Sequence, residues 1–190
     1  MADAGRVISG SARGIRLAAP GPGTRPIGDR VKQTLFAILD PDLRGARVLD
    51  LFAGSGAAGI EALSRGAGSA VFVERDAGAC GVIKANLERA RLAGPGVRVV
   101  KADVIAWLAG SAATEAAPFD IVIADPPYED TAALIGTLER LEPLLAPAAR
   151  VVAKHFWRDP SPPSVGLLAS ERERRFGETA LTFYRRQEVR

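Results

Sequence analysis

The stretch DLFAGSGAAG, residues 50–59, decides the fold of this 190-residue chain. It follows the apolar run 47–51, carries the pattern Gly-x-Gly-x-x-Gly at Gly54, Gly56 and Gly59, and leads into the alanine-rich stretch 57–65. Glycines let a backbone approach a ligand closely, and the start of a helix offers free N–H groups. The stretch therefore predicts a strand, a ligand-binding turn and a helix that Gly66 ends.

The same alternation continues beyond this stretch. Helical patterns separate short apolar runs that are rich in β-branched residues. Runs of this kind are typical of parallel strands that helices cover on both faces, and the crossovers between them are right-handed. We predict an α/β fold with a doubly wound, mostly parallel Rossmann-like sheet. The predicted strands lie at 47–51, 70–73, 97–100, 119–124 and 150–153, and the predicted helices at 57–65, 77–93 and 131–145, with Pro143 breaking the last.

The two ends of the chain follow other patterns. Residues 6–8 and 15–17 alternate around turn-forming residues, which predicts a small β-hairpin, and residues 20–26 form a linker rich in Pro and Gly. An amphipathic helix should begin near Asp29 and end before Pro41. At the other end, runs 165–169 and 180–184 flank Gly177, which predicts an antiparallel last strand. We expect a basic arm with its linker over 1–26 and the Rossmann-like domain over 27–190.

Composition limits the class of protein. Hydrophobic residues make up 47% of the chain and charged residues 25%, which is typical of a globular domain and excludes a disordered one. No apolar run reaches the roughly 18 residues of a membrane span, and we find no signal-peptide pattern. A single cysteine, Cys80, and a single histidine, His155, exclude an internal disulfide and a Cys/His metal centre. We expect a cytoplasmic protein that binds neither metal nor membrane.

Positive charge is concentrated at the start of the chain. The first 34 residues carry six basic groups against two acids, Asp3 and Asp29, in a chain with a net charge of +3. Arginine, which makes up most of these groups, suits bidentate contact with phosphate. A nucleic-acid grip and a merely solvated arm account for this charge equally well. The candidate RNA-contacting residues are Arg6, Arg13, Arg16, Arg25, Arg30 and Lys32.

An acidic residue stands at or just past the end of four successive predicted strands: Asp50, Glu74, Asp103 and Asp125. In an open parallel sheet the ligand binds beyond the carboxyl ends of the strands, so these acids should meet at one edge. A carboxylate at Asp50 would repel a pyrophosphate and suit an ammonium group, which favours S-adenosylmethionine over NAD. Glu74 could accept hydrogen bonds from the ribose hydroxyls of either ligand, and Asp103 from an adenine amine.

The sequence Asp125-Pro126-Pro127-Tyr128 follows the fourth strand. Two prolines make this loop stiff. A planar exocyclic amine is a poor nucleophile, because its lone pair is delocalised into the ring. The Asp125 carboxylate and the Pro126 carbonyl could each accept one N–H of such an amine and aim its lone pair at a methyl donor. Tyr128 could stack on the base.

These motifs together resemble the RsmD family of bacterial 16S ribosomal RNA (guanine-N2)-methyltransferases. The resemblance rests on RVISG (6–10), TRPIGDRVK (24–32), FAGSGAAGIEALSRG (52–66) and the Asp125–Tyr128 loop. It implies a monomeric enzyme that methylates a guanine of 16S ribosomal RNA within a small-subunit particle. It also implies a guanine site at Asp125, Pro126, Pro127 and Tyr128, and a donor site for S-adenosylmethionine at Asp50, Phe52, Ala53, Gly54, Ser55, Gly56, Glu74, Arg75, Asp103 and Val104.

Two other classes of function remain open on the sequence. A DNA adenine-N6 methyltransferase would share the Asp125–Tyr128 chemistry, although 190 residues leave little room for a target-recognition region. A non-catalytic or NAD-binding Rossmann module would share the glycine turn. We do not expect a cysteine nucleophile, because Cys80 falls in a predicted helix away from the strand ends.

Overall fold

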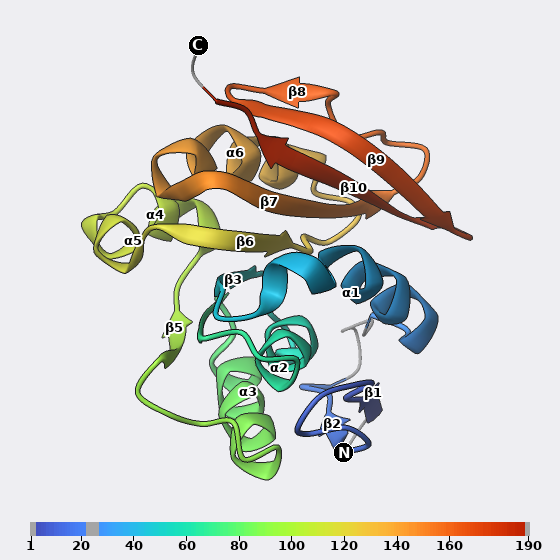
Figure 1. Cartoon of the computed structure of the whole chain (residues 1–190), viewed down its shortest axis with the longest axis vertical. Coiled ribbons are helices and arrows are strands. Elements are labelled where there is room, and N and C mark those ends of the chain that lie inside the picture. Colours follow the sequence, from blue (N-terminus) through green and yellow to red (C-terminus); the bar gives the residue numbers. More distant parts are fainter. Residues whose placement is uncertain (1–2, 22–26, 189–190) are drawn as a thin grey trace.

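A computed structural model of the chain describes residues 3–21 and 27–188. These residues form one eight-stranded sheet with helices on both faces, and a two-stranded hairpin beside it (Figure 1). The hairpin is β1 (Asp3–Arg6) with β2 (Arg16–Ala18). The sheet strands are β3 (Arg47–Leu51), β4 (Ser69–Glu74), β5 (Val97–Lys101), β6 (Phe119–Ala124), β7 (Leu145–Phe156), β8 (Ser164–Val165), β9 (Leu168–Phe176) and β10 (Thr179–Arg186). The helices are α1 (Asp29–Leu43), α2 (Ala57–Ser64), α3 (Ala77–Arg89), α4 (Val104–Leu108), α5 (Ser111–Ala116) and α6 (Thr131–Leu141), followed by a 3-10 turn at Glu142–Leu144.

The strand order is β5-β4-β3-β6-β7-β10-β9-β8. The first five of these strands run parallel, and β10, β9 and β8 are antiparallel to their neighbours. Leu49 of β3 lies between Val71 of β4 and Val122 of β6, so the direction of winding reverses between β3 and β6. The predicted fold class is therefore confirmed. The reversal fixes where a ligand cleft opens in such a sheet.

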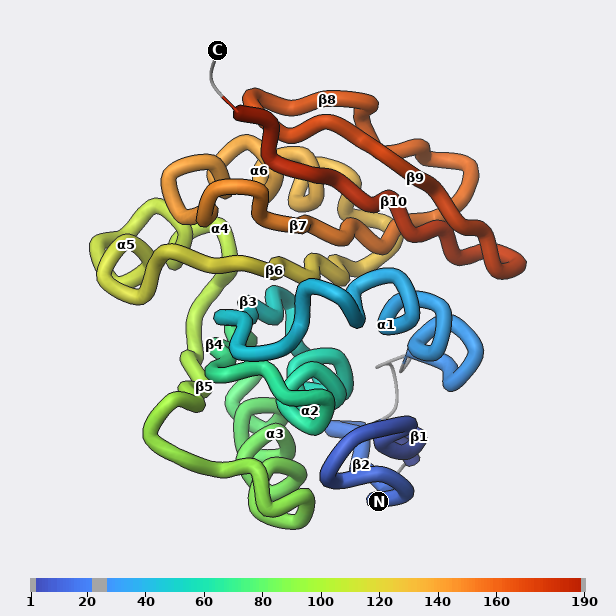
Figure 2. Tube along the Cα trace, viewed as in Figure 1, coloured from blue at the N-terminus to red at the C-terminus, as the bar shows by residue number. Residues whose placement is uncertain are grey.

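Successive residues along each central strand pack into two different hydrophobic cores, one on each face of the sheet. Val48 and Ile121 pack with α1, α2, α3 and the hairpin on one face. Leu49 and Val122 pack with α4, α5 and α6 on the other face. This explains why the strands read as unbroken apolar runs, since both faces of each strand are covered. Figure 2 shows the two groups of helices on either side of the sheet.

The N-terminal hairpin is docked on the domain instead of projecting from it. Val7 and Leu17 belong to the same core as α1 and α2. The buried carboxylate of Glu61 on α2 accepts hydrogen bonds from the backbone N–H groups of Ile8 (2.7 Å) and Ser9 (3.0 Å). A Cβ on Gly10, whose φ is +84°, would lie 1.8 Å from a backbone oxygen of α2. The hairpin and α2 therefore form one packed unit.

Several predicted boundaries move. Helix α1 continues through Pro41 to Leu43, because the buried side chains of Leu39 and Leu43 hold the last turn in the core. Helix α3 ends at Arg89, four residues earlier than predicted. Helix α6 ends at Leu141, where Pro143 forces a 3-10 turn. Within the described residues, none of the helices has the length and apolarity that crossing a bilayer requires.

Candidate active site

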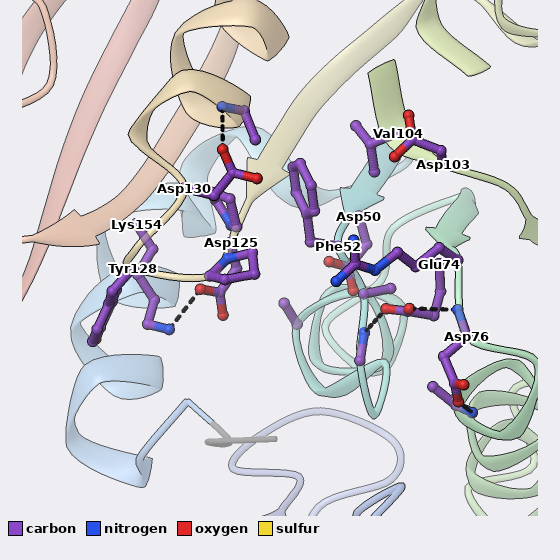
Figure 3. A pocket seen from close by; sticks show the side chains of 18 of the residues that line it. Asp50, Phe52, Glu74, Asp76, Asp103, Val104, Asp125, Tyr128, Asp130 and Lys154 are labelled. Atoms are coloured by element: carbon purple, nitrogen blue, oxygen red, sulfur yellow. Dashed lines mark hydrogen bonds and ion pairs between the residues drawn. The ribbon is translucent and has the colours of Figure 1, made fainter. Parts of the chain in front are cut away.

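A cleft of about 1020 Å³ opens at the carboxyl ends of β3, β4, β5, β6 and β7. The four acids predicted at the strand ends, Asp50, Glu74, Asp103 and Asp125, all line it (Figure 3). Phe52, Ala53, Gly54, Ser55, Arg75, Val104 and the whole Asp125–Tyr128 loop line it too. Gly56 lies at the N-terminus of α2 instead of lining the cleft. The structure thus brings together the residues predicted for the donor and the guanine.

The glycine turn needs its glycines for two different reasons. Gly56 has φ +76° as the N-cap of α2, a conformation that L side chains rarely adopt. A Cβ on Gly59 would lie 2.3 Å from the ring of Phe72 on β4 and 3.1 Å from a carboxylate oxygen of Asp50. Helix α2 therefore packs directly onto the sheet, with its N-terminus facing the cleft.

Asp50 lies beneath this turn and is 2% exposed. Its Oδ2 accepts a hydrogen bond from Gly59 N at 2.9 Å. Burial is the largest effect on this group and raises its pKa to about 8; the nearby carboxylates of Asp125 and Glu74 act in the same direction, and the Gly59 hydrogen bond opposes them. Near neutral pH, Asp50 therefore holds its proton much more tightly than an ordinary carboxyl group.

Glu74 ties the glycine turn to the loop after β4. Its Oε2 accepts a hydrogen bond from Gly54 N at 2.9 Å, and its Oε1 accepts one from Asp76 N at 2.9 Å. Asp103 is exposed, and its Oδ1 caps α4 by accepting a hydrogen bond from Ala106 N at 3.0 Å. Carboxylates thus stand at the ends of β4 and β5, where oxygen acceptors face the cleft.

The Asp125–Tyr128 loop is anchored at both ends. Asp125 N donates to Leu51 O of the neighbouring strand at 3.3 Å, and Asp130 N donates to Pro127 O at 3.0 Å. Asp130 then caps α6. The hydroxyl groups of Tyr128 and Thr179 on β10 lie 2.5 Å apart and share a hydrogen bond. The loop is therefore held between β3, α6 and β10.

The structure adds one functional candidate that sequence reasoning missed, Lys154 on β7. Its Nζ lies 2.5 Å from Asp125 Oδ1 and 4.8 Å from the centroid of the Tyr128 ring (Figure 3). Burial raises the pKa of Asp125, and the Lys154 ammonium opposes that rise. The available signal was a lone lysine directly after the apolar run 150–153 of a predicted buried strand.

The charge of the cleft distinguishes between ligands. Seven acidic and three basic side chains line it, and with Asp50 protonated, as its raised pKa implies near neutral pH, six carboxylates against three cations give a formal charge of −3. Such a lining is unfavourable for the pyrophosphate of NAD and favourable for a cation. S-adenosylmethionine carries a sulfonium and an ammonium group and has no phosphate, so the acidic lining of the cleft fits this ligand. The acidic residues are Asp50, Glu74, Asp76, Asp103, Asp125, Glu129 and Asp130.

The residues predicted to contact RNA differ in their exposure to solvent. Arg13 and Arg30 are exposed, and so are Arg6 and Arg16. Arg6 forms an ion pair with Asp29 of α1 (3.3 Å), and Arg16 forms one within the hairpin with Asp3 (2.9 Å). Arg25 lies outside the described residues. The prediction for Lys32 is wrong. Its side chain is fully buried and donates to Arg6 O at 2.5 Å, so its ammonium joins α1 to the hairpin and does not face a ligand.

Comparison with known proteins extends this picture to the whole chain. A family model described as "Conserved hypothetical protein 95" matches residues 5–185. The chain is 37% identical to YlbH of Bacillus subtilis (96% of this chain, 99% of the relative) and 36% identical to ribosomal RNA small subunit methyltransferase D of Escherichia coli (96% and 90%). Among solved structures, it resembles YhhF from Escherichia coli (33% identity, 96% and 97% coverage, TM-score 0.82) and a hypothetical protein from Thermus thermophilus (36%, 97% and 99%, TM-score 0.79). By full-length sequence and structural similarity, the chain belongs to this family, the RsmD family of ribosomal RNA methyltransferases.

Proposed function

We propose that this protein transfers a methyl group from S-adenosylmethionine to the exocyclic N2 of a guanine in 16S ribosomal RNA. The name of the Escherichia coli relative, ribosomal RNA small subunit methyltransferase D, supports the substrate. The single observation that carries the proposal is the juxtaposition of Asp125–Tyr128 with the acid-lined glycine turn in one cleft.

The donor half of the site comprises the glycine turn, Asp50, Glu74 and Asp103. When bound there, S-adenosylmethionine supplies an electrophilic methyl group on a sulfonium. Glu74 offers carboxylate oxygens for ribose hydroxyls, and Asp103 offers an acceptor for an adenine amine. The buried acid Asp50 lies beneath the turn, and the backbone N–H groups at the start of α2 would hold the amino-acid end of the donor.

The acceptor half comprises Asp125, Pro126, Pro127 and Tyr128. The Asp125 carboxylate and the Pro126 carbonyl would each accept one N–H of the guanine amine and direct its lone pair toward the methyl group. The Tyr128 ring offers a stacking surface for the base. Orientation of two bound reactants can contribute about 7–11 kcal/mol. No base is needed before attack: the new N–CH3 bond replaces the S–CH3 bond of the donor, and the methylated amine, which is then acidic, would release its extra proton to the Asp125 carboxylate or to water.

Lys154 supports Asp125 in this role. An ionised carboxylate accepts hydrogen bonds with both oxygens, whereas a protonated carboxyl group presents one of them as an O–H donor. Burial favours the protonated form of Asp125. The Lys154 ammonium binds Oδ1 and so favours the ionised form, leaving Oδ2 available to the amine. We therefore assign Lys154 as a positioning residue for Asp125.

The test is the variant Asp125→Ala in a methyl-transfer assay with small-subunit particles. We expect loss of transfer while the affinity for S-adenosylmethionine changes little, because Asp125 serves the acceptor. Glu139→Ala, which removes an exposed carboxylate from α6, is the control and should keep full activity. Full activity of Asp125→Ala would refute the role.

We further propose that the enzyme acts as a cytoplasmic monomer on the small-subunit particle. The only large hydrophobic side chain exposed among the described residues is Ile135, at 37%, so this surface offers little apolar area for a stable dimer. Light scattering should give a mass near 19.9 kDa.

Transfer of a labelled methyl group to DNA in preference to the small-subunit particle would favour the alternative function, a DNA adenine-N6 methyltransferase.

A further inference from the structure

A row of aromatic rings leads out of the cleft. The Tyr128 ring, which lines the cleft, lies 6.1 Å from the Phe156 ring, and Phe156 lies 6.4 Å from Trp157, measured between ring centroids. Phe156 ends β7, and Trp157 begins the loop after it. Both side chains are partly exposed. The row therefore joins the proposed guanine site to the molecular surface.

Two arginines end this row at the surface. The Arg175 guanidinium carbon lies 3.5 Å from the centroid of the Trp157 ring, and that of Arg158 lies 5.0 Å from it. Both arginines are exposed, and in the described part of the chain neither forms an ion pair. The Arg158 guanidinium and the two terminal nitrogens of Arg175 therefore remain available to an anion, while each guanidinium stays near an aromatic ring.

The β9–β10 turn holds this group beside the cleft. Trp157 N donates to Glu178 O at 3.0 Å, and Arg175 Nε donates to Gly177 O at 3.0 Å. Thr179, at the start of β10, pairs with Phe156 and shares a hydrogen bond with Tyr128. In Figure 1 this turn extends beyond the end of β7. The arginines and Trp157 are thus fixed relative to the Asp125–Tyr128 loop.

We propose that one surface binds the single-stranded RNA that flanks the target guanine. It consists of Trp157, Arg158 and Arg175, and we call it the Trp157 surface. This inference rests on the proposed function. A guanine that enters the cleft leaves its neighbours without a stacking partner, and proteins compensate such bases with aromatic rings and guanidinium planes. The two arginines supply contacts to flanking phosphates, and the aromatic row supplies the stacking surface.

The test compares arginines on the two faces of β9. Arg175 lies on the face of β9 that meets the Trp157 ring. Arg172 and Arg174 lie on the other face, because they pair with Phe183 and Leu181, whose side chains belong to the core that α1, α2 and α3 cover. We expect Arg158→Gln/Arg175→Gln to raise KM for small-subunit particles about tenfold and to reduce the salt slope of binding by about 1.4 for two lost phosphate contacts. Arg172→Gln/Arg174→Gln is the matched control, with the same charge change, and should stay within about twofold. Affinity for S-adenosylmethionine should be the same in all variants.

Trp157 fluorescence provides a second measurement. The chain has two tryptophans, and Trp107 is buried. In a Trp107→Phe background, addition of a single-stranded RNA carrying the target sequence should quench the emission of Trp157, and Trp157→Ala should weaken RNA binding by about fivefold or more. An active enzyme whose KM, salt slope and fluorescence do not respond would overturn this inference and leave the proposed function intact. Absence of transfer by the unaltered protein would instead overturn the proposed function.

Discussion

At the scale of single residues, Asp50 has the most unusual environment in the site. The carboxyl group is almost fully enclosed, accepts one backbone hydrogen bond, and has a pKa of about 8 against an ordinary value of 3.8. The folded protein therefore keeps a proton that the unfolded chain loses. This contribution to stability is complete below about pH 4 and is lost as the pH rises toward 8.

Asp50→Asn should remove that dependence on pH, because the amide is neutral at every pH and can still accept from Gly59 N. From pH 5 to pH 7.5, the free energy of unfolding of the unaltered protein should fall by about 2–3 kcal/mol more than that of the variant. Urea denaturation at the two pH values measures the difference. Parallel changes in the two proteins would show that burial does not raise the pKa of Asp50.

Lys154→Met should move the pH dependence of methyl transfer. Without the ammonium, the pKa of Asp125 rises further, so the acidic limb of kcat/KM should shift upward by about one pH unit or more. Activity at pH 9 should therefore recover relative to that at pH 7, which a merely structural role would not produce. Lys154→Arg keeps the charge and should keep the profile near that of the unaltered enzyme.

The acidic residues at the strand ends could be assigned to the site from the sequence, but contacts between residues that are distant in the sequence could not be predicted. Asp50, Glu74, Asp103 and Asp125 are regularly placed along the chain, and the topology brings them to one cleft. Lys154 meets Asp125 across 29 residues and two neighbouring strands, so nothing in the local pattern links them. Lys32 reads as one more of the basic residues that are concentrated in the first 34 positions, although helix α1 turns it into the core.

At the scale of elements, Asn86 on α3 joins the hairpin to the glycine turn. Its Oδ1 accepts from Ala18 N at 2.9 Å, and its Nδ2 donates to Ala18 O at 2.9 Å and to Ser55 O at 3.0 Å. The side chain is fully buried. One residue thus satisfies both backbone groups of the last residue of β2 and one carbonyl of the proposed donor site.

Asn86→Ala should therefore destabilise the fold and the donor site together. It leaves three buried backbone groups without partners, which should lower the free energy of unfolding by about 3 kcal/mol or more. Thermal unfolding with and without S-adenosylmethionine tests both effects. Glu88→Ala, an exposed change on the same helix, should alter neither; equal behaviour of the two variants would show that Asn86 does not join these elements.

Whether a segment forms a helix or a strand was predictable wherever its apolar pattern continues over enough residues. The five parallel strands and helices α1, α2, α3 and α6 follow from their patterns. Helices α4 and α5 are five and six residues long, too short for a helical period to be recognised. The extent of β7, twelve residues against four predicted, depends on pairing with β10, which the sequence of β7 does not reveal.

At the scale of the whole molecule, exposed basic residues lie on two separate parts of the chain next to the acid-lined cleft. The docked hairpin carries Arg6, Arg13 and Arg16, and the Trp157 surface carries Arg158 and Arg175. The alternation of strands and helices was enough to predict the doubly wound sheet. The position of the hairpin was not predictable, because it depends on buried partners in α2 and α3 that are reached only after folding.

The hairpin arginines should contribute to RNA binding through charge alone. We expect Arg6→Gln/Arg13→Gln/Arg16→Gln to weaken binding of single-stranded RNA and to lower the salt slope by about 2, if each arginine neutralises one phosphate. Titrations between 50 and 200 mM salt, roughly the range in which such slopes are resolved, provide the measurement. An unchanged slope would mean that these residues are only a solvated surface.

Nucleoside mass spectrometry of 16S ribosomal RNA from cells that lack this protein tests the central claim most directly. The account predicts less 2-methylguanosine than in the parent cells, restored by the unaltered protein and not by Asp125→Ala. An unchanged amount of 2-methylguanosine, with no transfer by purified protein to the small subunits of those cells, would contradict it.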